Sequence, residues 1–190
     1  MKTPRIIRSL RVWLTLLVLG GAMVSASAGE DIVLIDFADS RRDPDGKIFH
    51  AYEYTYQDWS KRVTDLRGRG VLVKAPSGKG GLGENRTMVK FDKTPKVELW
   101  FVVGNANKAA SMTFALTDRD GTEHQWSIPF AGRAAGQLLR HAIDLTKTDS
   151  EQKPGKTAGL DLKKIASWQV RGDFAEPSIE VLLVKLTGIK

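Results

Sequence analysis

The chain has 190 residues with 29 basic and 22 acidic side chains, no cysteine, and a formal net charge of +7. Four of the basic residues lie in the first 11 positions, so residues 29–190 hold 25 basic and 22 acidic side chains, a net charge of +3. A charge this small, without a basic stripe, argues against nucleic-acid binding. Without disulfides the fold must depend on its hydrophobic core, which a single domain of this length can supply.

Residues 1–28 have the pattern of a secretion signal. Basic residues precede the apolar run Val12–Val24, and Ala26–Ala28 supplies small residues for cleavage. A run of 13 residues is too short for a bilayer, which takes roughly 20. We therefore expect a cleaved signal helix, one domain over residues 29–190, no membrane span after cleavage, and a periplasmic or secreted location.

The first part of the expected mature chain predicts short strands between turn-rich loops. Apolar or alternating runs predict extended segments at Asp31–Phe37, Phe49–Trp59, Val71–Lys74 and Thr87–Phe91. Charge and glycine predict exposed loops over Lys61–Arg69 and Pro76–Asn85.

The middle of the chain predicts three consecutive antiparallel strands. Val97–Val103 is apolar and aromatic, and Met112–Thr117 alternates apolar with small residues. Asp118–Gly121 then predicts a hairpin loop, and His124–Phe130 resumes the alternation. This meander favours a β-sandwich.

The last part of the chain extends the all-β pattern. It predicts a strand at Gln137–Leu145, an exposed loop at Thr146–Gly159, a helical turn at Leu160–Ile165, and strands at Ala166–Gly172 and Ile179–Ile189. The apolar centre of the last strand, Val181–Val184, predicts burial on both faces. Eight to ten short strands without an amphipathic helix predict an all-β jelly-roll sandwich.

The order of these segments resembles the galactose-binding-like jelly-roll superfamily, which includes many carbohydrate-binding modules. The matching segments are Leu34–Asp39, Trp100–Asn107, Asp118–Gly121, Ile143–Leu145, and Leu160–Leu162 with Ile165–Val170. The resemblance implies an exported binding module whose partner is a polysaccharide or glycan. It also leaves room for a structural calcium near Asp36 and Asp39, although the final strand lacks the acidic residue that such modules often carry; no other cofactor is expected.

Nothing in the sequence singles out a catalytic centre. The three histidines are far apart, which argues against a zinc site. Strand-borne acids such as Glu98 and Glu123 could face each other as a glycosidase pair, but no pattern marks them. We interpret the chain as non-catalytic, with a small glycan-active enzyme as the least favoured alternative.

Aromatic residues are the main signal for a binding site. Tyr52, Tyr54 and Tyr56 are spaced by two and share one face of an extended segment, so with Trp59 they could stack on sugar rings. Asn105 and Asn107 could then read the hydroxyl groups. Trp100 and Trp126 lie in apolar strands and are expected in the core. The tyrosine row could equally be the buried side of its strand, which would leave a structural or protein-interaction domain without a sugar site.

Overall fold

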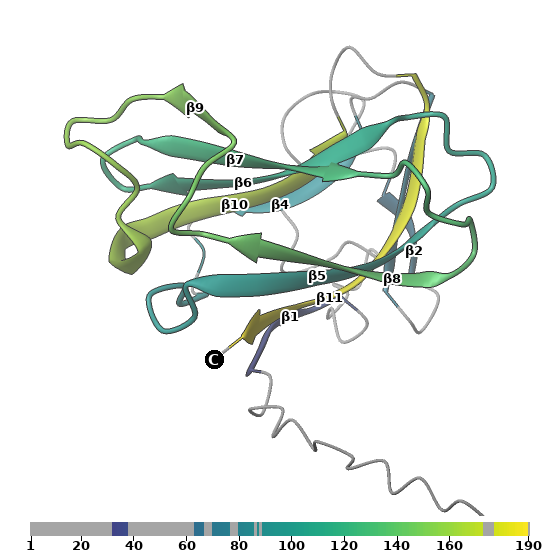
Figure 1. The fold of residues 1–190 in the computed structure, drawn as a ribbon, viewed down its shortest axis with the longest axis horizontal. Coiled ribbons are helices and arrows are strands. Elements are labelled where there is room, and N and C mark those ends of the chain that lie inside the picture. Colours follow the sequence, from purple (N-terminus) through teal and green to yellow (C-terminus); the bar gives the residue numbers. More distant parts are fainter. Residues whose placement is uncertain are drawn as a thin grey trace, which may run out of the picture.

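The structure is a computed structural model that describes residues 32–37, 63–66, 70–76, 80–85, 87, 89–172 and 177–189. These residues form a β-sandwich in which two antiparallel sheets lie one above the other (Figure 1). The lower sheet in Figure 1 has the order β2-β3-β11-β5-β8, with β1 also paired to β11, and the upper sheet has the order β4-β10-β6-β7-β9. The expected all-β jelly-roll sandwich is therefore confirmed.

The strands have between 4 and 11 residues. The lower sheet consists of β1 (Ile32–Asp36), β2 (Val63–Leu66), β3 (Val71–Ala75), β5 (Lys96–Val103), β8 (Leu138–Asp144) and β11 (Ile179–Ile189). The upper sheet consists of β4 (Gly81–Asn85), β6 (Ser111–Asp118), β7 (Glu123–Pro129), β9 (Ser150–Lys153) and β10 (Ile165–Gly172). A single 3-10 turn, Leu162–Lys164, precedes β10, as the sequence predicts. Within the described residues, no helix has the length and apolar character needed to cross a membrane.

Strand β11 pairs with three strands of the lower sheet. Its first half pairs with β3, its second half pairs with β1 along the same edge, and its other edge pairs with β5. Val181 and Leu183 point into the core, whereas Leu182 and Val184 are half-buried. The expectation that this segment is buried on both faces is wrong, because the upper sheet covers one face only.

The core lies between the two sheets. Alternate residues of each strand enter it, and its largest fully buried side chains include Trp168, Phe91, Phe101 and Phe114. Trp168 packs edge-on against Phe37, with ring centroids 5.9 Å apart. The core is thus built from residues far apart in the chain.

Several elements at the edges of the sheets differ from those predicted from the sequence. Residues 63–66 form β2 where a loop was expected, and the glycine-rich segment contains β4. Residues 89–91 lie outside any strand, and β9 falls within the expected loop at residues 146–159. At Gly80, which directly precedes β4, a Cβ would lie 2.8 Å from the Cβ of Ala75, so close packing favours glycine at this position.

Candidate functional site

Most of the sequence-predicted site lies outside the described residues. This applies to the proposed stacking residues Tyr52, Tyr54, Tyr56 and Trp59 and to the metal candidate Asp39. The two asparagines and Asp36 are described.

The two asparagines have different surroundings in the loop between β5 and β6. Asn105 is exposed. Asn107 donates from Nδ2 to the carbonyl of Ala109 at 2.9 Å and accepts at Oδ1 from the backbone N–H of Glu180 at 3.1 Å. The amide of Asn107 therefore ties the loop to the start of β11.

Asp36 lies at the end of β1 and is exposed. In the part of the chain that the structure describes, no three histidine or acidic side chains are grouped closely enough to hold a metal ion. These residues alone thus do not make a calcium site, and the calcium stays a prediction.

The hairpin loop predicted at Asp118–Gly121 is a turn, closed by a hydrogen bond from the N–H of Gly121 to the carbonyl of Asp118. The Asp118 carboxylate accepts the backbone N–H groups of Asp120 at 2.9 Å and Thr122 at 3.0 Å through one oxygen. Its other oxygen accepts the N–H of Asp161 at 3.1 Å. The oxygens thus hold backbone, and Gly121 adopts a φ of +93° in the turn.

The described aromatic rings are nearly all in the core. Trp126, expected there, is buried, and its Nε1 donates to the carbonyl of Lys147 at 2.6 Å. Trp100 differs from the expectation, because it lies on the outer face of β5 and is half-buried. Its ring carries the guanidinium of Arg140 at 3.7 Å and the ammonium of Lys185 at 3.9 Å.

The outer face of the upper sheet is almost entirely polar. On each strand the core residues alternate with outward ones, so the outward residues of β6, β7 and β10 line this side. Cross-strand pairing aligns Gln169, Ala115 and Gln125 in one row and Ser167, Thr117 and Glu123 in the next. We call the following residues the polar face: Thr113, Ala115, Thr117, Glu123, Gln125, Ser127, Ser167, Gln169 and Arg171.

Hydrogen bonds connect the long side chains of the polar face. Arg171 donates from Nη1 to Oε1 of Gln169 and lies 3.4 Å from Oε1 of Glu123 through Nη2. The same Glu123 oxygen accepts from Nε2 of Gln125 at 2.7 Å. Four side chains from two strands thus form one network over β6.

The network is enclosed by its neighbours. The side chains of Arg171 and Glu123 are 14% and 19% exposed, and Gln169 is 9% exposed. Ala115 lies beneath them on the same face and is 1% exposed, although it does not belong to the core cluster. Low exposure weakens the competition from water, so these hydrogen bonds hold the four side chains in place.

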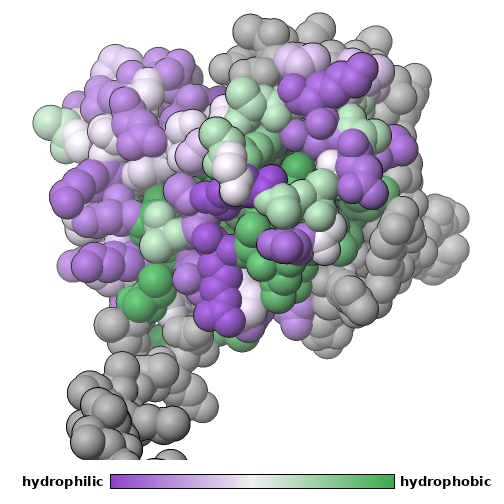
Figure 2. Space-filling view, turned by 45° about the vertical axis from the view of Figure 1, so that its right-hand side comes forward, coloured by the Kyte–Doolittle hydropathy of each residue, from purple (hydrophilic) through white to green (hydrophobic). Residues whose placement is uncertain are grey.

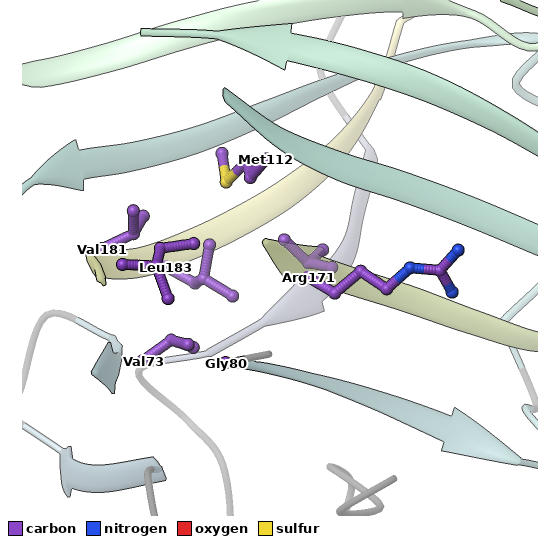
Figure 3. Close-up of a pocket in the computed structure, with 8 residues that line it drawn as sticks. Val73, Gly80, Met112, Arg171, Val181 and Leu183 are labelled. Atoms are coloured by element: carbon purple, nitrogen blue, oxygen red, sulfur yellow. The ribbon is translucent and has the colours of Figure 1, made fainter. Parts of the chain in front are cut away.

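One gap between the two sheets is too small for a ligand. A gap of about 160 Å³ between the sheets is lined by Val73, Met112, Val181 and Leu183 among others, and none of it admits a water-sized sphere. Figure 3 shows these side chains around the gap and the Arg171 guanidinium pointing away from it. This gap therefore does not hold a ligand.

Burial and a neighbouring cation lower the pKa of His141, a histidine that lies between the two sheets. Nδ1 of His141 accepts a hydrogen bond from Nη2 of Arg133 at 2.8 Å, since a guanidinium can only donate. Burial, with the charge of Arg133 in second place, lowers the pKa of His141 below its usual value. Burial also lowers the pKa of Arg133, whose guanidinium lies 5.2 Å from the Phe101 ring. His141 is thus neutral at physiological pH.

Part of the polar face could be predicted from the sequence. The hairpin at Asp118–Gly121 sets the register of β6 and β7, so Gln125 and Ala115 could have been paired. The position of β10 beside β6 could not be read, because 46 residues separate Asp118 from Ile165 and no local signal joins them.

The fold has counterparts among solved structures. An agarase matches with a TM-score of 0.53 and 16% identity, over 84% of this chain and 25% of the agarase chain. A family 11 carbohydrate-binding module from Clostridium thermocellum, in complex with a beta-1,3-1,4-mixed-linked tetrasaccharide, matches with a TM-score of 0.47 and 15% identity, over 63% of this chain and 74% of that one. The family 11 module of a cellulosomal cellulase from the same organism matches with a TM-score of 0.47 and 17% identity, over 67% and 78% of the two chains. No family model and no curated protein matches the sequence. The expected resemblance is confirmed as a likeness of fold.

Proposed function

We propose that residues 29–190 form an exported, non-catalytic module that binds a polysaccharide or another cell-surface polymer. The polar face carries the proposal, because it holds amide, guanidinium and carboxylate groups side by side in fixed positions. Sugar hydroxyls both donate and accept hydrogen bonds, so a face that offers both kinds of group suits them. One protein that shares the fold is described as an agarase, and that likeness supports the architecture alone.

The proposed stacking wall remains the tyrosine row. Tyr52, Tyr54 and Tyr56, with Trp59, would cover the apolar C–H side of a sugar ring while polar groups read its hydroxyls. Asn105 is exposed and can take part, whereas the amide of Asn107 is already bonded to backbone at both ends.

The placement of the strand-borne acids supports a non-catalytic role. Glycoside hydrolysis takes two carboxyl groups about 5–10 Å apart across the bond. Glu98 lies on the outer face of β5 in the lower sheet, and Glu123 lies on the outer face of β7 in the upper sheet. The whole sandwich separates them, so these two cannot act as a pair.

The test is calorimetric titration of residues 29–190 with neutral polysaccharides chosen by a glycan array. Gln125→Ala and Gln169→Ala should each weaken binding roughly two- to tenfold, since each removes a hydrogen-bonding amide. Glu98→Gln, on the opposite outer face, is the matched control and should bind like the wild type. Equal affinity of all three folded variants would exclude the polar face.

A separate variant tests the stacking wall. Tyr54→Ala should lower affinity by about 0.5–1.5 kcal/mol plus the loss of buried area, with an unchanged melting temperature. Unfolding of this variant would instead place the tyrosine row in the core. If the wild type binds no glycan on the array, the alternative of a structural or protein-interaction domain replaces the proposal.

A further inference from the structure

The two outer faces of the sandwich differ in chemistry. The outer face of the lower sheet carries a row of aliphatic residues across four strands, made of Leu72, Leu182, Val102 and Leu138. Leu138 is 53% exposed. Figure 2 shows one side of the molecule, where hydrophobic residues reach the surface among hydrophilic ones. A second row beside the aliphatic one aligns Lys185, Trp100 and Arg140.

The two cations of this second row have no acidic partner among the described residues. Arg140 and Lys185 contact the Trp100 ring, from β8 on one side of β5 and from β11 on the other. Neither takes part in an ion pair of the described chain, and neither pairs with Glu98, the carboxylate two residues along β5 on the same face. Asp36 lies opposite Lys185 on the neighbouring strand β1, but no ion pair joins the two. The indole is thus covered by two cations that form no ion pair among the described residues.

The indole itself carries an unused donor. Nε1 of Trp100 is buried and has no hydrogen-bond partner in the described structure. A buried donor without an acceptor is unfavourable, so an acceptor brought to this point would be bound with gain. Because two cations lie over the ring that carries this donor, an acceptor with negative charge fits best.

We propose that Trp100, Arg140 and Lys185 bind an acidic sugar unit of a polysaccharide, with the cations pairing to its carboxylate or sulfate and the indole stacking on its ring. Both cations are long, flexible side chains that rest on the indole when no ligand is bound. An acidic sugar supplies the charge that draws them off the ring and the C–H surface that replaces them. A neutral sugar supplies the C–H surface but no charge, so it leaves the cations on the indole ring. This surface is distinct from the polar face, and the inference rests on the proposed function because its ligand is a polysaccharide.

The position of this surface on an open sheet favours a polymer over a free ion. A single small oxyanion at an exposed site stays largely hydrated and is screened by salt. A polysaccharide with repeating charges binds more tightly, because later units add contacts at high effective concentration.

The experiment follows the indole N–H signal of Trp100 by ¹H–¹⁵N NMR, assigned with Trp100→Phe. Residues 29–190 are titrated with polygalacturonate, dextran sulfate, neutral dextran and sodium sulfate. We expect a saturable shift of the Trp100 signal with one or both polyanions and none with dextran or sulfate ion. The first arm identifies a carboxylate ligand and the second a sulfate ester.

Matched variants separate a site from general attraction. Arg140→Gln and Lys185→Gln should each weaken polyanion binding by about tenfold. Lys96→Gln removes a cation from the same face of β5 and should have less than a twofold effect. Equal losses in all three variants, or an equal shift of Trp100 with dextran or with sulfate ion, would overturn the proposal.

The two sets of variants keep the two proposals apart. Loss of neutral-glycan binding in Gln169→Ala tests the polar face and should leave the Trp100 titration unchanged. Polyanion binding that never shifts Trp100 would reject the second surface while leaving the first untouched.

Discussion

The carboxylate of Asp118 accepts the backbone N–H of Asp161 at 3.1 Å, across 43 positions of the chain. This bond joins the β6–β7 hairpin to the turn that leads into β10. Asp118 is buried, and its two oxygens together hold three backbone N–H groups. The Asp118 side chain therefore connects the hairpin between β6 and β7 to the turn that precedes β10.

Replacing Asp118 should be costly for this reason. Asp118→Ala leaves three backbone donors without an acceptor and should lower the free energy of unfolding by about 2–4 kcal/mol. Asp120→Ala is the control, because it removes only one exposed bond, to the hydroxyl of Thr157, and should cost less than about 1 kcal/mol. Urea unfolding measures both. Equal midpoints for the two variants would contradict this role of Asp118.

Two neighbouring leucines of β11 test which side of this strand faces the core. Leu183 is 1% exposed in the core, so Leu183→Asp should cost several kcal/mol through an unpaired buried charge. Leu182 faces outward, and Leu182→Asp should cost about 1 kcal/mol. Thermal melts of both variants check the prediction. If Leu182→Asp proved the more damaging, the register of β11 would be wrong.

Gly70 lies where no side chain fits. A Cβ at this position would lie 1.7 Å from the carbonyl oxygen of Leu183, so Gly70→Ala must push β3 away from β11. We expect a loss of more than 2 kcal/mol in unfolding free energy. Gly132→Ala is the matched control, since its φ of +72° is strained for alanine but open space surrounds it. It should cost about 1–2 kcal/mol. Similar losses from the two would show that the close approach does not matter.

The lowered pKa of His141 predicts a pH dependence of stability. In the unfolded chain the histidine takes up a proton near its usual pKa of 6.5, whereas the folded protein resists protonation. The unfolded state therefore binds more protons below about pH 6.5, and stability falls as the pH falls from there toward the folded pKa. Hydrogen bonds chiefly lower the pKa values of Asp144 and Asp161 in the folded protein. Their contribution to stability is therefore lost only as the pH falls below their usual pKa of 3.8.

The measurement compares melting temperatures at pH 7.5, 6.5 and 5.5. The wild type should lose more stability over this range than His141→Asn, whose side-chain oxygen can still accept from Arg133. Parallel profiles for the two proteins would show that His141 does not titrate differently on folding.

The central strands could be predicted from the sequence and the edge elements could not. Val97–Val103 and Ile179–Ile189 are long, apolar and alternating, and the structure places strands there almost residue for residue. Strands β2 and β9 are 4 residues each, too short for a clear alternation, so their pairing comes from neighbours rather than from a local pattern. Strand β4 contains two glycines, and its sequence therefore predicts a loop.

The candidate site was predictable only in part. Spacing by two can place residues on one face of a strand, but it cannot tell which strands become neighbours. Gln125 and Gln169 meet over Ala115 only because β10 inserts beside β6. Trp100 was expected in the core because its strand is apolar, and the alternation of β5 puts it on the other side.

The pairing of β11 with three strands has a consequence for how the protein is made. Strands β1, β3 and β5 are all translated long before residues 179–189, and each must wait for them with an unpaired edge. Such edges can pair with other chains during the delay. A product cut short before Ile179 would keep them open permanently, so we expect truncated chains to aggregate rather than to fold partially. The pairing of the lower sheet is thus complete only once β11, its last strand in the chain, is in place.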